Sequence, residues 1–291
     1  MSRVQLIVTG DLEQLALHRS LQRVFPAADF LEPLRLDGFT SARIGDKAQA
    51  AVRQAGLHSV PTVRKLAGAM VAEVEPGRRR FEVPDLVVCI EDLELANADQ
   101  PQVVIEHFLG ALRAVMEKGP WGSQASKDRA EERLRERCSF HLLCPMVEAY
   151  FYGEAAAPRR AGAVRPNRFA TGDADVEQFI VDDPDYQTPA DGLRWWAKPD
   201  RARHPKRYLD FLCTEPGDLT ASSARQYRET DGGVRALEQL AWNAILALPG
   251  HAVFAGSLFA DIADGLGEPW PDAAECSPHT RRRVGGVLRN A

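Results

Sequence analysis

Short, nearly continuous apolar runs alternate along the first half of the chain with segments of helical periodicity. Such runs predict buried strands, because the strands of a parallel sheet are covered on both faces. Apolar residues spaced three and four positions apart predict helices between them. The predicted strands are residues 4–8, 30–36, 87–90 and 140–144. The predicted helices are residues 12–24, 41–55, 62–74, 101–118 and 124–137, with a further helix starting at 145.

This alternation predicts an α/β fold for residues 1–154, with a mostly parallel sheet flanked by helices. Residues 155–192 are rich in Ala, Pro, Arg and Asp and show little periodicity, so we expect an irregular excursion. Residues 193–291 regain helical spacing, and we expect a helical C-terminal region that packs on the first domain. Its predicted helices are residues 208–213, 233–248 and 252–263.

Acidic residues follow three of the predicted strands. The carboxyl ends of parallel strands meet at one edge of an open sheet, where such folds bind their ligands. Carboxylates gathered there repel one another unless water, a cation or a basic partner offsets their charge. Because Mg²⁺ prefers carboxylate oxygen, we predict a site for Mg²⁺ or Mn²⁺ at this edge. Its predicted ligands are Glu13, Glu91, Asp92, Glu94 and Glu148.

Several of these acids also have a structural interpretation. The acids of residues 91–94 would form a solvated loop that opens the next helix, whose dipole favours negative charge. Asp11 and Gln14 resemble a capping box, which makes Glu13 a residue of the first helical turn. The two interpretations are compatible, because a helix N-terminus over a site also favours phosphate. Glu148 is a lone acid in an apolar, aromatic stretch and requires either a partner or a site.

Composition and charge narrow the class of protein. The 291 residues are 45% hydrophobic and 26% charged, as in ordinary soluble globular proteins. The net charge of −5 argues against a surface that binds nucleic acid everywhere, so such contacts must come from a local patch. No apolar run approaches the ~20 residues of a membrane span. The first residues do not resemble a signal peptide, so we expect no membrane contact and a cytoplasmic location.

The five cysteines are scattered and contain no CxxC pair. The spacing Cys138-x-x-His141-x-x-Cys144 matches none of the common zinc patterns. We interpret the cysteines as buried thiols in a reducing compartment.

A local basic patch lies in residues 194–208, which carry six Lys or Arg residues and one Asp. Basic residues interleaved with aromatic ones suit single-stranded or flexible nucleic acid, which requires phosphate neutralisation and base stacking. The alternative is that the tryptophans anchor the C-terminal region while the arginines are solvated. The predicted nucleic-acid-binding residues are Arg194, Trp195, Trp196, Lys198, Arg201, Arg203, Lys206 and Arg207.

Two short motifs at strand ends resemble the TOPRIM family. The first strand ends in Val8-Thr9-Gly10-Asp11-Leu12-Glu13, and a later strand ends in Asp92-Leu93-Glu94. Residues 145–149 and 204–209 are similar to a group of small bacterial TOPRIM-related proteins, akin to nucleases of the overcoming-lysogenization-defect type. The resemblance spans residues 1–150, and beyond them only the second of these segments supports it.

The resemblance implies a TOPRIM-like fold and a metal-dependent nuclease that hydrolyses phosphodiester bonds in DNA or RNA. Some relatives act in anti-phage defence. The catalytic residues that it implies are Glu13, Asp92, Glu94 and Lys206, with the lysine stabilising charge in the transition state.

The chain departs from the TOPRIM pattern in two places. The family carries a glutamate at the position of Thr9, and its second motif usually ends in aspartate where this chain has Glu94. Carboxylates replace one another in metal binding, whereas a threonine cannot act as a general base. One alternative is therefore a non-catalytic TOPRIM-shaped subunit that docks a partner protein such as an ATPase. Another is a small-molecule phosphotransfer or phosphohydrolase enzyme with the same site.

Overall fold

The computed structural model describes residues 1–46, 61–75, 83–169, 174–187, 201–215, 227–247, 250–270, 276–277 and 286–291. Within these ranges one parallel sheet contains five strands. They are β1 (Arg3–Val8), β2 (Asp29–Phe30), β3 (Leu34–Arg35), β4 (Leu86–Asp92) and β5 (Cys138–Leu143). The strand order is β2-β1-β4-β5, and β3 pairs with the second half of β1. The predicted α/β class with a mostly parallel sheet is confirmed.

The strand predicted over residues 30–36 is divided in two. Pro33 lies between β2 and β3, and proline has no N–H with which to continue a hydrogen-bonded ladder. The side chain of Gln5 bridges the interruption, because its Nε2 donates to the carbonyl of Glu32 at 2.9 Å. Both short strands therefore remain paired with β1.

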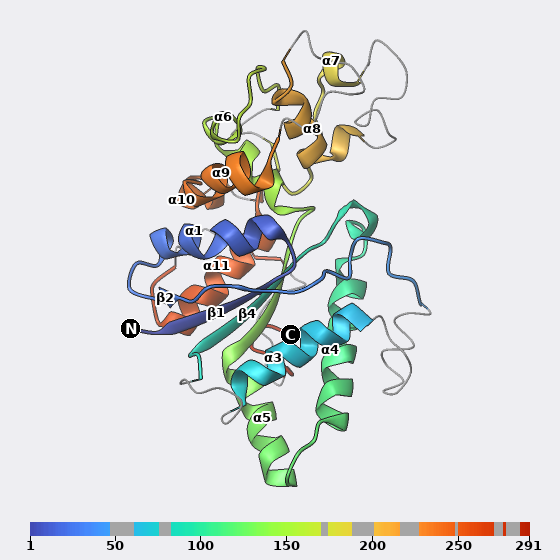
Figure 1. Cartoon of the computed structure of the whole chain (residues 1–291), viewed down its shortest axis with the longest axis vertical. Helices are drawn as coiled ribbons and strands as arrows, with labels where there is room; N and C mark the ends of the chain where they lie inside the picture. The colour runs from blue at the N-terminus through green and yellow to red at the C-terminus, as the bar shows by residue number, and fades with distance from the viewer. Residues whose placement is uncertain are drawn as a thin grey trace.

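Helices cover both faces of the sheet (Figure 1). One face of the sheet is covered by the π-helix η1 (Glu13–Leu17), by α1 (His18–Val24) and by α11 (Val253–Leu266). The other face carries α3 (Pro61–Val74), α4 (Pro101–Lys118) and α5 (Gln124–Arg137).

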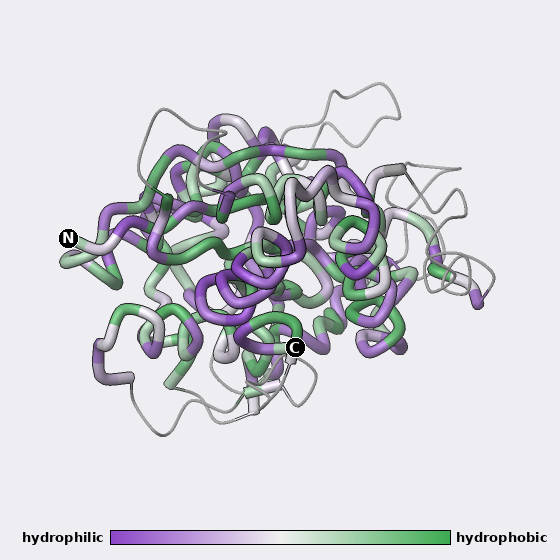
Figure 2. The backbone as a smooth tube through the Cα atoms, turned by 90° about the horizontal axis from the view of Figure 1, so that it is seen from below, coloured by the Kyte–Doolittle hydropathy of each residue, from purple (hydrophilic) through white to green (hydrophobic). Residues whose placement is uncertain are grey.

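Successive strand residues enter opposite apolar clusters. In β1, Leu6 and Val8 pack on the side of α1, whereas Ile7 packs on the side of α4. Because both faces are covered, the strands read as nearly continuous apolar runs. Hydrophobic and hydrophilic positions alternate along the helical turns that cover them (Figure 2).

The residues after 154 contribute to the same layers. Besides α11 on the sheet, they form α6 (Ala157–Arg160), α7 (Pro184–Gln187), α8 (Pro205–Leu212), α9 (Val234–Glu238) and α10 (Trp242–Leu246). Apolar side chains of α8, α9 and α10 belong to the cluster that contains α1. Glu177, in the predicted irregular excursion, accepts hydrogen bonds from the amides of Phe254 and Ala255 at the start of α11. The excursion therefore helps to position a helix of the sheet layer, although the domain boundaries themselves remain a prediction.

Three helix predictions require correction. Residues 41–45 are not helical, and residues 47–55 of that predicted helix lie outside the described part of the chain. The helix predicted from 145 is the 3₁₀-helix η3 (Val147–Gly153), which begins two residues later. The helix predicted over 233–248 is broken between α9 and α10.

The break between α9 and α10 has a local cause. The carboxylate of Glu154 accepts a hydrogen bond from the amide of Ala241 at 2.9 Å. This amide lies between α9 and α10, so the bond gives a partner to a backbone group that the helices leave unpaired. Trp242 is buried, and its Nε1 donates to the hydroxyl of Ser20 at 2.8 Å. Burying this ring against α1 fixes where α10 begins.

The buried-thiol interpretation holds for Cys89, Cys138, Cys144 and Cys213, while Cys276 is partly exposed. No helix in the described ranges is both long and apolar enough to cross a membrane.

Asn290 covers β5, the last strand in the sheet order. Its side chain accepts from the amide of Phe140 at 3.1 Å and donates to the carbonyl of the same residue at 2.7 Å. The amide of Arg289 donates to the carbonyl of Cys138 at 2.9 Å. Residues 289–290 thus satisfy backbone groups of an edge strand that would otherwise need a neighbouring strand.

We predict that Asn290→Ala destabilises the fold by about 2–4 kcal/mol. The substitution leaves two buried backbone groups of Phe140 without their partner, and each costs ~1–3 kcal/mol. Urea unfolding of the full chain measures the effect. The control is Asn243→Ala on the exposed side of α10, which we expect to change stability by less than about 0.5 kcal/mol. Equal stability of the two variants would contradict the role of Asn290.

Candidate functional site

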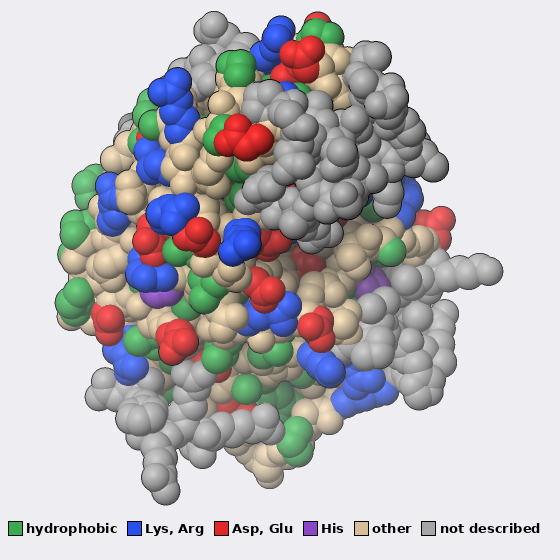
Figure 3. All heavy atoms as spheres, turned by 45° about the horizontal axis from the view of Figure 1, so that its top comes forward, with side chains coloured by type: hydrophobic (Ala, Val, Ile, Leu, Met, Phe, Trp, Pro, Cys, Tyr) green, Lys and Arg blue, Asp and Glu red, His purple; other side chains and the backbone are tan. Residues whose placement is uncertain are grey.

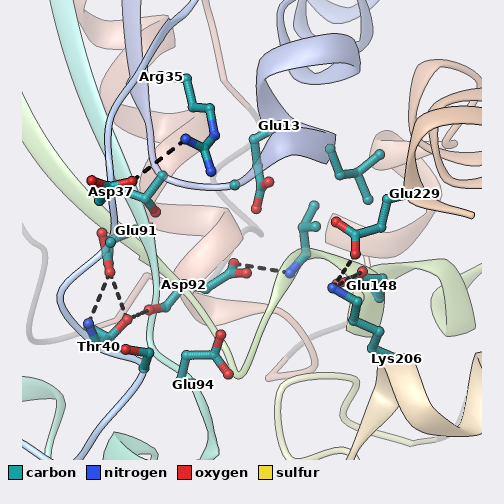
Figure 4. Close-up of a pocket in the computed structure, with 16 residues that line it drawn as sticks. Glu13, Arg35, Asp37, Thr40, Glu91, Asp92, Glu94, Glu148, Lys206 and Glu229 are labelled. Atoms are coloured by element: carbon teal, nitrogen blue, oxygen red, sulfur yellow. Dashed lines mark hydrogen bonds and ion pairs between the residues drawn. The ribbon is translucent and has the colours of Figure 1, made fainter.

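A cavity of about 270 Å³ lies at the carboxyl ends of β1 and β4, beside the end of β3. Acidic side chains gather in and around this hollow, with basic side chains at its edge (Figure 3). They come from distant parts of the sequence and are shown together in Figure 4. The acidic lining residues are Glu13, Asp37, Glu91, Asp92, Glu94, Glu148 and Glu229, and the basic ones are Arg35 and Lys206.

Glu13 enters the cavity from the turn that follows β1. It is the first residue of η1 and only 4% exposed. Its carboxylate folds back over Gly10, where a Cβ atom would overlap with Oε2 of Glu13. Asp11 does not cap the helix as predicted; its Oδ1 instead lies 2.5 Å from Nε of Arg35. Gly10 therefore provides the space that the buried carboxylate of Glu13 occupies.

Asp92 and Glu94 reach the cavity from the end of β4. Oδ1 of Asp92 accepts a hydrogen bond from the amide of Val147 at 3.1 Å, which joins this strand end to η3. Glu94 has φ 59° and ψ 154°, a region that residues other than glycine rarely adopt. Its amide donates to the carbonyl of Pro145 at 2.7 Å. The surrounding backbone thus holds Glu94 in a strained conformation with its carboxylate at the cavity.

Glu91 differs from its neighbours because one of its oxygens is already used. Oε1 accepts hydrogen bonds from the amides of Phe39 and Thr40 at 2.9 and 3.2 Å, and from the hydroxyl of Thr40 at 2.7 Å. The side chain is 1% exposed, and its Oε2 is buried without a hydrogen-bond partner in the described structure. Glu91 therefore organises the loop after β3, whereas its predicted role as a metal ligand stays a prediction.

Glu148 and Lys206 approach from η3 and α8. Nζ of Lys206 forms an ion pair with Oε1 of Glu229, in the turn η5 (Glu229–Gly233), and lies 3.8 Å from Oε1 of Glu148. The hydroxyl of Tyr227 donates to the same Glu148 oxygen at 3.4 Å. Glu148 is only 3% exposed, so the predicted need for a partner or a site is met by a lysine, a tyrosine and the cavity itself.

Burial and mutual repulsion make these acids hard to ionise. Burial, followed by the carboxylate of Glu148, raises the pKa of Glu13 to about 8. Burial raises the pKa of Glu148 to about 7, against the opposing effect of Lys206. Burial and the charges of Glu13 and Glu94 raise the pKa of Asp92 well above its usual range. The cavity therefore carries protons near neutral pH that a bound cation would displace.

The donor set suits a hard cation but is not closed around one. Carboxylate oxygens dominate the lining, and Mg²⁺ and Mn²⁺ favour oxygen. The orphaned Oε2 of Glu91 adds a buried acceptor to the same lining. In the described ranges, however, no three Asp, Glu, His or Cys side chains are arranged to hold a metal ion. Cation binding would therefore require the carboxylates to turn toward one another.

The structure brings the predicted acids together and describes part of the predicted basic patch. All five predicted ligands line the cavity, as does Lys206. Arg201 and Arg203 form the short helix η4 (Arg201–Arg203), and Arg207 follows on α8. The remaining predicted nucleic-acid-binding residues, Arg194, Trp195, Trp196 and Lys198, lie outside the described residues.

Among the charged lining residues and their partners, Arg35, Asp37, Tyr227 and Glu229 were not predicted from the sequence. Asp37 directly follows the strand predicted over residues 30–36, so the rule that found the other acids would also have found it, whereas Arg35 lies within that strand. Tyr227 and Glu229 follow no strand and belong to no periodic segment. Only the packing of η5 against the site reveals them.

Comparison with protein-family models, curated proteins and solved structures gives no match for this chain.

Glu94→Gly and Glu94→Ala together test the strain at this position. Both remove the carboxylate, but only glycine adopts the observed backbone angles without steric cost. We expect the glycine variant to be more stable than the alanine variant by about 1 kcal/mol, although glycine normally lowers stability relative to alanine. Thermal and urea unfolding of the two proteins provide the comparison. A more stable alanine variant would show that Glu94 is not strained.

We predict that the metal-free protein loses stability as pH rises from about 5 to about 8. The pKa of Glu13 is near 4.5 in the unfolded chain and about 8 in the folded one. Between these values the folded state binds more protons, so the free energy of unfolding falls with increasing pH. Glu13→Gln should make the decline shallower, as measured by urea unfolding at several pH values with EDTA present. The control is Glu132→Gln, an exposed change on α5, which should keep the wild-type slope of unfolding free energy against pH. If Glu13→Gln kept that slope as well, Glu13 would not be its cause.

Proposed function

We propose that the chain is a metal-dependent phosphodiesterase that cleaves DNA or RNA, built on a TOPRIM-like fold. One observation carries the proposal: Glu13, Asp92, Glu94 and Glu148 converge from separate segments on one cavity at the carboxyl end of the sheet. Structural acids are normally exposed or paired, because burying several together is unfavourable. Their concentration at the ligand-binding edge of an α/β fold supports a cation site.

The residues of the cavity have distinct roles in this proposal. Glu13, Asp92, Glu94 and Glu148 would hold Mg²⁺ or Mn²⁺. The bound ion would neutralise phosphate oxygens, lower the pKa of a water molecule and stabilise the leaving oxygen. Lys206 places an ammonium beside the same acids, where it would offset the charge of the phosphodiester in the transition state.

A neighbouring cavity supports a polymeric substrate. It measures about 310 Å³ and is lined by Arg43, Leu95, Ala98, Asp99 and Arg203. Arg43 and Leu95 lie two residues and one residue beyond Ser41 and Glu94, which line the first cavity. Arg203 is exposed in a segment with further basic residues. In this proposal Arg203 would offer a positive charge to a longer strand bound at the acidic cavity.

Thr9 favours one alternative. It lines the cavity where the TOPRIM pattern has a glutamate, and its hydroxyl cannot serve as a general base at neutral pH. A subunit with this cavity would bind cation and nucleic acid, or a partner such as an ATPase, without cleaving. The experiment below separates the two.

We expect purified protein with Mg²⁺ or Mn²⁺ to cleave at least one of plasmid DNA, single-stranded DNA and tRNA. Asp92→Asn should reduce the rate at least ~100-fold, the scale on which single electrostatic groups act in transition states. Asp128→Asn, which neutralises an exposed aspartate of α5, is the matched control and should cleave like wild type. Cleavage that survives Asp92→Asn would reject the proposed site. Salt-sensitive binding without cleavage would support the non-catalytic alternative.

A further inference from the structure

Both basic side chains of the acidic cavity are paired with acids outside the predicted ligand set. Nε of Arg35 lies 2.5 Å from Oδ1 of Asp11, and its Nη1 lies 3.7 Å from Oδ1 of Asp37. Nζ of Lys206 contacts Glu229, at the edge of the cavity opposite Arg35 (Figure 4). Each of these basic side chains is therefore held by a carboxylate that is not a ligand in the proposed metal site.

Lys206 is the cation that would interfere most with that site. Its Nζ is already within 3.8 Å of Glu148, and its charge also acts on Glu13, Asp92 and Glu94. Lysine carries a compact charge on a flexible stem with four carbons, so its ammonium can move by several ångströms. If Lys206 moved onto these carboxylates, it would neutralise them and compete directly with a divalent cation.

Glu229 is fixed by a tightly packed turn. A Cβ atom at Gly232 would overlap with the carbonyl of Ala161, and one at Gly233 would lie 2.6 Å from the hydroxyl of Tyr227. Both glycines are buried. The turn therefore cannot shift toward its neighbours, and it sets the position of the Glu229 carboxylate.

The same segment also contacts Glu148 directly. Tyr227 is 4% exposed and donates its hydroxyl to Oε1 of Glu148. Residues 227–233 thus supply a neutral hydrogen-bond donor for Glu148 and a separate carboxylate for Lys206. Oε1 of Glu148 therefore accepts from the neutral Tyr227 hydroxyl at 3.4 Å, while the ammonium of Lys206 lies 3.8 Å away and is in contact with Glu229.

We propose that Glu229 is a positioning residue that holds the ammonium of Lys206 at the cavity edge, so that Glu148 and the acids beside it remain available to a divalent cation. The proposal deepens the proposed function and rests on it, because it requires the cation site. It predicts that loss of Glu229 weakens cation binding mainly through Lys206. It also explains how Lys206 can lie close enough to contact a phosphate while the carboxylates of the metal site stay free of its ammonium.

The test is a double-substitution cycle read by calorimetric titration of Mn²⁺ alone into the full chain. Glu229→Gln should weaken Mn²⁺ binding about tenfold, because the released ammonium moves onto Glu148. Lys206→Met should bind Mn²⁺ at least as tightly as wild type. In the doubly substituted protein, Glu229→Gln should change the affinity less than threefold relative to Lys206→Met. Glu229→Asp keeps the charge and should restore most of the wild-type affinity.

The cycle separates positioning from a general loss of negative charge. If Glu229 acted only through its field, Glu229→Gln would weaken Mn²⁺ binding equally with and without Lys206, and the proposal would be overturned. The matched control is Glu238→Gln, which removes the acid of another ion pair of similar exposure, to Arg19, and should leave Mn²⁺ affinity unchanged. Failure of wild type to bind Mn²⁺ at millimolar concentration would reject the cation site together with this role. If wild type binds Mn²⁺ but the effects of the two substitutions on affinity simply add, the role of Glu229 is rejected and the cation site stands.

Discussion

Carboxylates that are buried beside one another repel, so they must either bind protons or face a positive charge, and this constraint governs the whole carboxyl edge of the sheet. Glu13, Asp92 and Glu148 are drawn there by the fold, because each follows a strand of one parallel sheet. Burial, followed by the charges of neighbouring carboxylates, raises the pKa values of these acids, and among the described residues no three of them are arranged to hold a metal ion. The basic residues do not cancel the excess of acids, since Arg35 and Lys206 are paired with other carboxylates.

The rest of the fold keeps these acids close to one another. The apolar clusters on the two faces fix β1, β4 and β5, so the ends of the strands cannot separate. Glu91 ties the loop after β3 to the end of β4, and Glu177 ties the start of α11 to η3 through the hydroxyl of Tyr150 at 2.7 Å. Glu177 accepts hydrogen bonds with both carboxylate oxygens, whereas Glu91 accepts all three of its hydrogen bonds with Oε1. Both carboxylates hold neighbouring segments in place, but only Glu91 also lines the cavity.

How much could be predicted from the sequence follows from this difference. Apolar runs predicted the strands, and parallel strand ends share an edge, so Glu13, Asp92, Glu94 and Glu148 could be placed together without coordinates. The pattern could not tell that Glu91 would accept three hydrogen bonds from Phe39 and Thr40, because that loop depends on tertiary contacts. It also gave no signal for Glu229, whose position results from the packing of η5 against Ala161 and Tyr227.

Several features that oppose stability coincide at one place in this protein. Glu94 has a strained backbone, Glu13 and Glu148 are buried acids with raised pKa values, and Oε2 of Glu91 lacks a hydrogen-bond partner. Each costs free energy of folding, and natural sequences otherwise tend to satisfy such groups. Departures of this kind are expected where function requires them, since a ligand can return the free energy that they cost. Their concentration in a single cavity is therefore an argument for a ligand of opposite charge that does not depend on any resemblance to a known family. A divalent cation at the proposed site would attract the repelling oxygens, displace their protons and give the carboxylate of Glu94 a partner.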